Sequence, residues 1–206
     1  MGAAKRHVET VIGTLEQHGV VCTRLLLNDE RVDAFSGNFS DHPVAVLATD
    51  KAKWDRSRFD AAHELGHLVM HEEAAGLPEA ERQAHEFAAA FLMPARDIKR
   101  SLPARADWAT FVALKAEWGT SIASLLRRAM TLGVMSENPY IAANNVLSAR
   151  GWRRHEPVAG PPETPMLLRR AMKRAAKSGT DPEALRREVA IRKDLFDGVC
   201  QLISTD

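Results

Sequence analysis

The sequence predicts an α+β protein, with a small antiparallel sheet packed with a helix pair and a mostly helical C-terminal extension. Two observations point to this fold class. Short runs rich in Val and Leu, separated by turn residues, fill residues 20–48, as is typical of strands. From Arg58 onward, apolar residues recur at the spacing of three and four that indicates helices.

Each of the first elements has a signal of its own. Apolar residues at helical spacing, closed by a glycine at position 19, predict a helix over Ala3–His18. The expected strands are Val20–Leu27, Arg31–Phe35 and Pro43–Ala48, with NDE, SGN and SDHP as turns between them. The linkers are short, and parallel strands need a crossover of about a dozen or more residues. We therefore expect an antiparallel meander.

The rest of the chain is predicted to be helical. We expect helices over Ser57–His71, from Pro78 to about Pro94, as two pieces within Trp108–Ser136, and over Met166–Lys177 and Pro182–Lys193. The pair within 108–136 has the spacing of a helix-turn-helix-like element. Its second helix offers Arg127 and Arg128 but few other base-reading side chains, so we expect it to pack rather than to read DNA. The predicted units are 1–101, 102–136 and 137–206.

Composition excludes several classes of protein. The chain has 206 residues, 45% hydrophobic and 27% charged, with a net charge of +1, which excludes wholesale disorder. Two cysteines, Cys22 and Cys200, are too few for a disulfide scaffold and fit a reducing compartment. The longest apolar run, Phe87–Ala95, is interrupted by Pro94 and is too short to span a membrane. With no signal-peptide stretch at the N-terminus, these features predict a cytoplasmic protein.

Positive charge is concentrated towards the C-terminal part of the chain. Residues 1–148 carry a net charge of −3, whereas residues 149–193 carry +7. Most of this positive charge lies on the two predicted helices Met166–Lys177 and Pro182–Lys193. Basic faces are common on solvated helices, and these two helices offer no aromatic stacking platform. We therefore expect weak nucleic-acid binding or none.

The residues most typical of catalysis are His63-Glu64-Leu65-Gly66-His67. Two histidines four residues apart on a helix share one face, roughly 6 Å apart along the axis, so both imidazoles can reach one ion. The glutamate after the first histidine can act on water at an open coordination position. We therefore predict that His63 and His67 bind a metal ion and that Glu64 is the catalytic carboxylate.

Two histidines leave such a site one ligand short, since catalytic zinc usually has three protein ligands. His71 lies roughly 12 Å from His63 along the helix axis, so we expect it to support a ligand or to pack. Spacing favours Glu81, with His85 on the same helix face to orient a ligand. Four other glutamates remain open as alternatives: Glu72, Glu73, Glu79 and Glu86.

Four segments together resemble the ImmA/IrrE family of metallo-endopeptidases. They are RFDAAHELGHLVMH (Arg58–His71), ERQAHEFAAAFLMP (Glu81–Pro94), WGTSIASLLRRAMTLGVMS (Trp118–Ser136) and GWRRHEP (Gly151–Pro157). The resemblance implies a zincin-like HExxH helix pair, with His63, His67 and Glu81 as ligands and Glu64 as the catalytic residue. The chain departs from the family at His85, where asparagine is commoner.

The resemblance also implies a function. It indicates a zinc-dependent endopeptidase that cleaves a cytoplasmic phage-type helix-turn-helix repressor, encoded nearby, and so relieves repression of a mobile-element or stress operon. Many relatives carry an N-terminal helix-turn-helix; there is no room for one before the first strand, so we expect the DNA-binding partner to be a separate protein. The ligand types suit Zn²⁺ and also allow Mn²⁺.

Two alternatives belong to other classes. One is a non-catalytic, metal-containing regulator that binds a repressor or DNA, and the other is a toxin–antitoxin component. Glu64 discriminates against the regulator, since a structural metal site needs no carboxylate at an open coordination position. Residues that could stabilise an oxyanion are Tyr140, Arg153, Arg154 and His155, and spacing selects none of them. The oligomeric state is left open.

Overall fold

The computed structural model describes residues 7–27, 32–39, 42–49, 53–71, 77–188, 193 and 196, and it confirms the α+β class. Its elements in chain order are α1 (Val11–Gln17), β1 (Val21–Leu25), β2 (Ala34–Phe39), β3 (His42–Ala48), α2 (Trp54–Met70), α3 (Pro78–Leu92), α4 (Ala95–Ile98), the 3₁₀ turn η1 (Lys99–Ser101), α5 (Trp108–Trp118), α6 (Ile122–Thr131), α7 (Glu137–Ala149), α8 (Leu167–Lys177) and α9 (Pro182–Glu188).

The sheet is mixed, so the predicted antiparallel meander is wrong for one of its two pairings. Strand order is β1-β3-β2. Strands β2 and β3 pair antiparallel, with Phe35 opposite Val46, whereas β1 runs parallel to β3, with Cys22 opposite Ala45. Residues 26–41 separate β1 from β3 and contain β2 itself, which makes this connection long enough for a parallel crossover. The prediction considered only the short links between consecutive strands.

One predicted turn is also wrong. Ser36, Gly37 and Asn38 lie inside β2 rather than between strands. A Cβ on Gly37 would lie 3.3 Å from the ring of Phe39, so the glycine leaves room for that aromatic side chain in the strand. The SGN composition is typical of a turn, but strand pairing with β3 overrides it.

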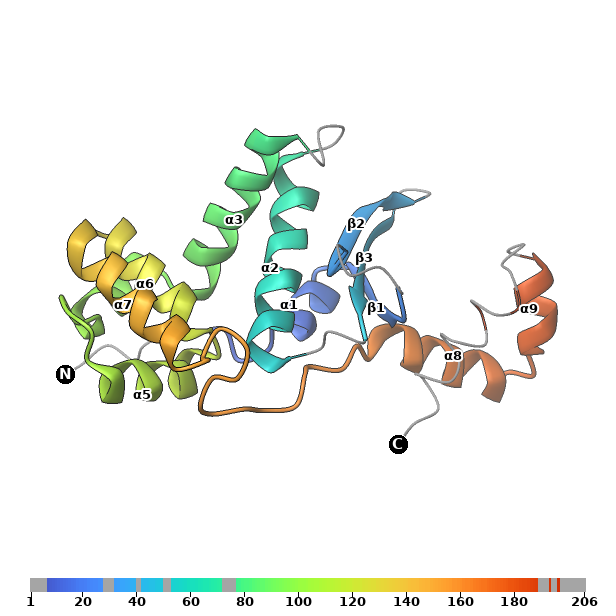
Figure 1. The fold of residues 1–206 in the computed structure, drawn as a ribbon. Helices are drawn as coiled ribbons and strands as arrows, with labels where there is room; N and C mark the ends of the chain where they lie inside the picture. The colour runs from blue at the N-terminus through green and yellow to red at the C-terminus, as the bar shows by residue number, and fades with distance from the viewer. Residues whose placement is uncertain are drawn as a thin grey trace, which may run out of the picture.

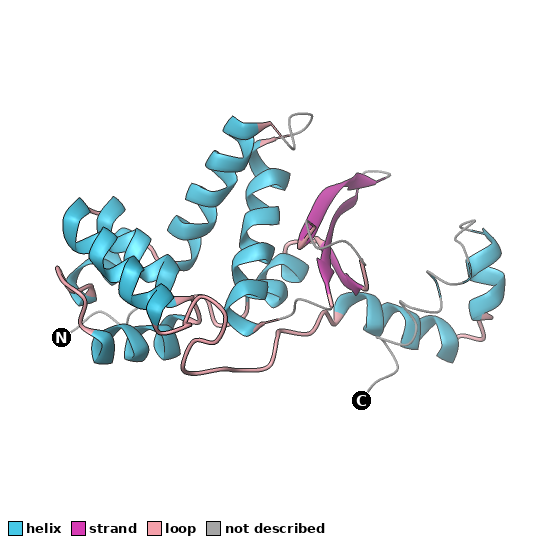
Figure 2. Ribbon diagram, in the orientation of Figure 1, coloured by secondary structure: helices cyan, strands magenta, loops and turns pink. Residues whose placement is uncertain are grey.

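Helix α2 is the central element of the molecule. It packs against the sheet through β2 and β3 and against α3 on its other side. Figures 1 and 2 show α2 and α3 side by side, with α5, α6 and α7 beyond α3. On the opposite side of the molecule, α8 lies next to β1 and α9 lies farther from the sheet. The metal-site candidates on α2 and α3 therefore lie in the middle of the fold.

Most predicted helices are found close to their expected bounds, with one clear difference at the N-terminus. Of the helix predicted over Pro182–Lys193, α9 covers Pro182–Glu188, and residues 189–192 lie outside the described residues. Among the described residues, the first helix begins at Val11 rather than near Ala3; positions 1–6 of that prediction lie outside the described residues. The two helices α5 and α6 are separated at residues 119–121, as the sequence predicts, and Gly119 ends α5 with a φ of +62°. The unit boundaries at 101 and 136 stay predictions.

Buried apolar residues form a cluster that extends from α1 through the sheet, α2 and α3 to α7. The 0% exposed side chains of Val11, Phe111 and Leu147 mark its extent. No helix in the described ranges is both long enough and apolar enough to cross a lipid bilayer.

Polar contacts tie the segment between α7 and α8 to the rest of the fold. Lys115 of α5 is 2% exposed and forms ion pairs with Asp55 of α2 and with Glu156 of this segment. Further along, Glu163 pairs with the buried Arg58 of α2 and accepts a hydrogen bond from the backbone N–H of Ile12. The segment is thus held across the N-terminal half of α2.

Candidate metal centre

A close contact between two helices positions the candidate ligands. A Cβ on Gly66 of α2 would lie 3.1 Å from the Cα of Ala84 on α3. Along the buried stripe of α3, the small residues Ala80 and Ala88 lie on either side of Ala84. Small side chains on both helices let the two backbones approach, and this brings residue 81 of α3 opposite the histidines of α2.

Three side chains meet at this contact, and we call His63, His67 and Glu81 the ligand cluster. The Nε2 atoms of His63 and His67 are 3.0 Å apart. Glu81 places Oε2 3.1 Å from Nε2 of His63 and Oε1 3.3 Å from Nε2 of His67. One donor atom from each residue lies within 4.8 Å of those of the other two, and no other such group of three occurs in the described part of the chain.

The ligand cluster fits a tetrahedral metal ion. With zinc bonds of about 2.0–2.1 Å, neighbouring ligand atoms of a tetrahedral site lie about 3.3 Å apart. The observed separations of 3.0, 3.1 and 3.3 Å are close to that value, with each carboxylate oxygen of Glu81 next to a different histidine nitrogen. Burial, together with the neighbouring imidazoles of His67 and His85, lowers the pKa of His63, which favours the neutral form that binds metal. Two imidazoles and one carboxylate form a typical catalytic zinc ligand set.

A chain of hydrogen bonds leads from Glu79 through Gln83 and His71 to His67. Gln83 donates through Nε2 to Glu79 Oε1 at 2.9 Å, and its Oε1 lies 2.9 Å from His71 Nε2. A neutral His71 then carries its proton on Nε2 and accepts at Nδ1, so His67 donates from Nδ1 across 3.3 Å. His67 is left with Nε2 unprotonated towards the ligand cluster, as metal binding requires.

The other histidines of the site are placed differently. His85 contacts the ring of His63 edge-on at 5.1 Å between centroids and the ring of Phe59 at 5.0 Å. The described residues show no hydrogen bond from His85 to a candidate ligand, so it supports His63 by ring packing. The Nδ1 atom of His63 is buried without a partner within the described ranges, in contrast to Nδ1 of His67.

Glu64 lies beside the ligand cluster and is not part of it. The residue is 5% exposed, and its Oε2 accepts a 2.6 Å hydrogen bond from Ser36 of β2. Burial raises the pKa of Glu64 to about 7, and the hydrogen bond from Ser36 opposes that rise. A cavity of about 500 Å³ is lined by Glu64, Ser36 and the three residues of the ligand cluster. Glu64 therefore faces the same space as the candidate ligands.

The alternatives from the sequence separate clearly in space. Glu79 and Glu86 both pair with Arg82, away from the ligand cluster, and Glu72 and Glu73 lie outside the described residues.

Of the residues considered for oxyanion stabilisation, Arg153, Arg154 and His155 line a second, larger cavity that also reaches Glu81. Tyr140 lines neither of these two cavities and packs against the hydrophobic core.

Sequence reasoning missed two residues of the site. The sequence predicts a turn at Ser36 and gives no sign of its contact with Glu64, which arises because the sheet packs on α2. Gln83 belongs to the same helix as Glu81, and its four-residue spacing from Glu79 is a visible signal for their hydrogen bond. Its contact with His71 depends on the packing of α2 on α3.

Comparison with known proteins identifies the family of the chain. The family model for the IrrE N-terminal-like domain, Peptidase M78, matches residues 15–130, a span that contains the sheet, both site helices and α5. No curated protein is significantly similar to the chain. The matched span covers more than half of the sequence and includes every residue of the ligand cluster together with Glu64. The chain thus belongs to the IrrE N-terminal-like, Peptidase M78 family of metallopeptidases.

Proposed function

We propose that this metallopeptidase is a zinc-dependent endopeptidase in which His63, His67 and Glu81 hold the ion and Glu64 is the general base. One observation carries the proposal: Glu64 is a buried carboxylate that faces the ligand cluster without belonging to it. A purely structural metal site has no use for such a group. Mn²⁺ accepts the same ligand types and is the alternative ion.

The bound ion would supply Lewis acidity, polarising the scissile carbonyl and activating water. Ser36 occupies Oε2 of Glu64, so Oε1 is the oxygen that accepts the water proton and returns it to the leaving amine. Burial raises the pKa of Glu64 to about 7, which is near the optimum for a general base at neutral pH. The charge of a bound cation would oppose this increase in pKa. The hydrogen-bond chain through His71 and Gln83 holds His67 in its ligand form.

The proposed substrate is a helix-turn-helix repressor of the phage type, encoded nearby and cleaved in the cytoplasm. The support for this substrate is the resemblance of the chain to ImmA/IrrE endopeptidases. The rival function is a regulator that binds the repressor without cutting it. Both functions require the ligand cluster, and they differ in their need for Glu64.

The test compares Glu64→Gln and His63→Ala with the wild type after co-expression with the neighbouring repressor. Glu64→Gln preserves side-chain shape and removes the proton acceptor, so it should keep its metal and lose about 10²- to 10⁴-fold in rate. His63→Ala should lose metal and cleavage together. Cleavage is scored on a gel, and metal content is measured on the purified proteins.

The outcome separates the two functions. A Glu64→Gln protein that holds metal and binds the repressor but leaves it intact supports the endopeptidase. If the same variant relieves repression in cells as fully as the wild type, proteolysis is not the function and the binding regulator replaces it.

A further inference from the structure

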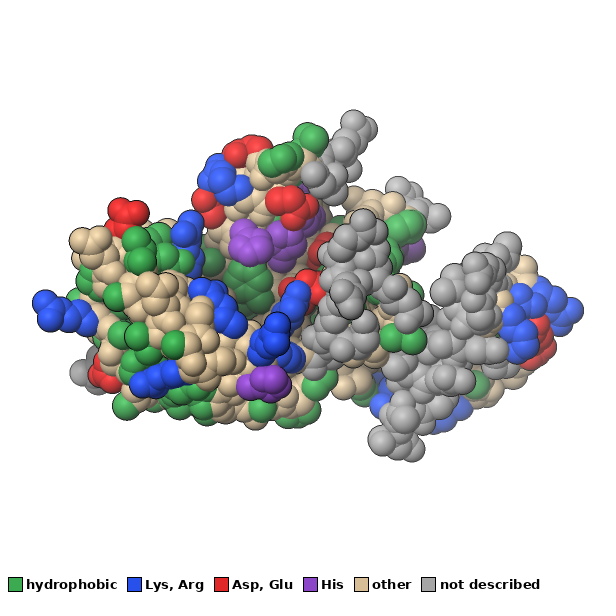
Figure 3. Space-filling model, viewed as in Figure 1, with side chains coloured by type: hydrophobic (Ala, Val, Ile, Leu, Met, Phe, Trp, Pro, Cys, Tyr) green, Lys and Arg blue, Asp and Glu red, His purple; other side chains and the backbone are tan. Residues whose placement is uncertain are grey.

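A large groove runs from the ligand cluster towards helices α5 and α6. Its volume is about 1530 Å³, and its walls are α2, α3, α6 and the segment between α7 and α8. Glu81 and His85 line it on the α3 side, so it is continuous with the candidate metal centre. Figure 3 shows histidine side chains in a hollow of this face, with Lys and Arg side chains around it.

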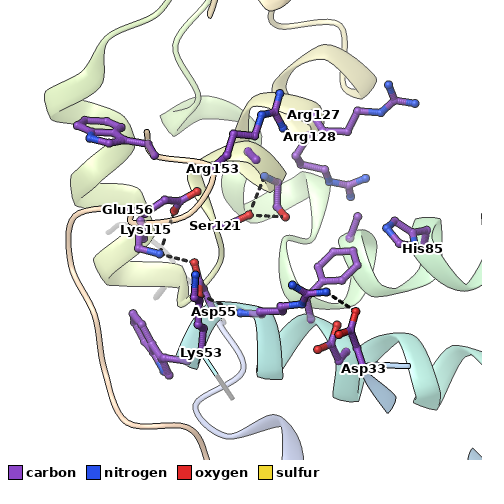
Figure 4. Close-up of a pocket in the computed structure, with 18 of the residues that line it drawn as sticks. Asp33, Lys53, Asp55, His85, Lys115, Ser121, Arg127, Arg128, Arg153 and Glu156 are labelled. Carbon is purple, nitrogen blue, oxygen red and sulfur yellow. Dashed lines mark hydrogen bonds and ion pairs between the residues drawn. The ribbon is translucent and has the colours of Figure 1, made fainter. Parts of the chain in front are cut away.

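Helix α6 presents one polar face to this groove. Ser124, Arg127, Arg128 and Thr131 line it at the spacing of three and four that places residues on one helix face. In Figure 4, Arg127 and Arg128 of α6 lie in the same half of the view as His85 of α3. This face and His85 line the same groove, and His85 also lines the cavity of the ligand cluster.

Several cations of the groove already have carboxylate partners. Arg56 pairs with Asp33. Arg82 pairs with two glutamates of its own helix, and Lys115 pairs with an aspartate and a glutamate. These side chains are neutralised within the protein.

Arg128 and Arg127 differ from these cations. Arg128 is 9% exposed, donates from Nε to the backbone oxygen of Met93 at 3.0 Å, and has no carboxylate partner among the described residues. Burial lowers its pKa, with no opposing contribution from a carboxylate. Arg127 is exposed one residue before it, and the described ranges show no carboxylate partner for its guanidinium either. Burying an unpaired charge is costly unless an anion is supplied.

We propose that Arg127 and Arg128 form a carboxylate subsite for an Asp or Glu side chain of the substrate polypeptide, held in the groove beside the bond to be cut. Guanidinium groups suit this role because they bind carboxylates with two parallel hydrogen bonds. The inference rests on the proposed endopeptidase function and specifies the chemistry of its substrate.

The charge of the whole groove favours a polypeptide over a nucleic acid. Its basic side chains are interspersed with the carboxylates of Asp33, Asp55 and Glu156. The groove therefore lacks the continuous basic stripe that is typical of a nucleic-acid site. A polypeptide can present one carboxylate to Arg127 and Arg128 and neutral or basic residues elsewhere.

The test uses internally quenched decapeptide mixtures with Glu fixed at each position in turn, matched by mixtures with Gln at the same position. The zinc-loaded full-length protein should cleave one Glu mixture with a kcat/KM about tenfold above that of its Gln counterpart, as expected for one charge-assisted contact. Arg127→Gln should reduce that ratio towards one, and Arg127→Glu should shift the preference to Lys at that position. Arg105→Gln, which removes an exposed arginine outside the groove, is the matched control and should keep the ratio.

A binding measurement separates this inference from the proposed function. The Glu64→Gln protein is titrated into the fluorescently labelled Glu and Gln mixtures, with and without Arg127→Gln, and anisotropy is recorded. One outcome is that the wild-type protein cuts no peptide while the Glu64→Gln protein binds the Glu mixture more tightly than the Gln mixture, and Arg127→Gln removes this difference. In that case the carboxylate subsite stands and the endopeptidase function fails.

Three results would overturn the inference. The first is the absence of a Glu preference in both cleavage and binding. The second is a preference that Arg127→Gln and Arg105→Gln reduce equally. The third is Arg127-dependent binding of duplex DNA with no Arg127-dependent binding of the Glu mixture. Because Arg128 is buried, its variants are scored only after their unfolding midpoint is shown to match that of the wild type, and Arg127 alone suffices for the decision.

Discussion

The hydrogen-bond chain behind His67 makes Gln83 a sensitive test of the site, although Gln83 does not belong to the ligand cluster. Gln83→Leu removes the acceptor that holds the proton of His71 on Nε2, and with it the reason for His67 to keep Nε2 unprotonated. The change affects the two hydrogen bonds of the chain that involve His71, one to Gln83 and one to His67. Each contributes about 0.5–1.5 kcal/mol. The expected loss is therefore about 1–3 kcal/mol, or about 5- to 150-fold in zinc affinity, in line with other groups that support metal ligands.

Zinc affinity is measured by competition with a chromogenic chelator at constant pH, on variants whose unfolding midpoints are known. Glu79→Ala should have a smaller effect, because Glu79 only orients the Gln83 amide. Glu86→Ala should have none, since Glu86 pairs with Arg82, and Glu81→Ala should abolish tight binding. Wild-type affinity in Gln83→Leu, or an equal loss in Glu86→Ala, would refute the role of the chain.

Three further predictions concern stability. Lys115→Met should lower the free energy of unfolding by about 3–5 kcal/mol in urea titrations, because it leaves the carboxylates of Asp55 and Glu156 without their buried partner; a loss below about 1 kcal/mol would contradict it. Burial raises the pKa of Asp60 to about 7. The folded protein therefore loses stability as the pH rises from the ordinary pKa of an aspartate to above 7, because the buried carboxyl must ionise. The melting temperature of Asp60→Asn should exceed that of the wild type at pH 8 and not at pH 4. Val158 has a φ of +61°, which is unfavourable for a β-branched residue. Val158→Asn should therefore raise the free energy of unfolding by about 1 kcal/mol in the same urea titration. A lower unfolding midpoint than that of the wild type would argue against strain at this position.

The local parts of this protein follow from its sequence. The spacing of His63 and His67 within a helical pattern is enough to place both on one face, and the α2 and α3 helices occur where apolar periodicity and Pro78 predict them. The placement of Glu81 near the histidines also agrees with its position in the next helix. These features depend on neighbours within one or two helical turns, where backbone geometry fixes the separation of side chains.

The features that sequence reasoning missed depend on contacts between distant segments. Strand β1 lies parallel to β3 because β2 forms part of the crossover, and Ser36 reaches Glu64 only because that sheet packs on α2. The groove lies where α6 meets the end of α3, and there Arg128 has no carboxylate partner in the part of the chain that the structure describes. The residue types, their helical spacing and the chemistry of the metal site were decided locally by the sequence. Tertiary packing alone decided which buried charges have partners, because burial and pairing are properties of the assembled fold.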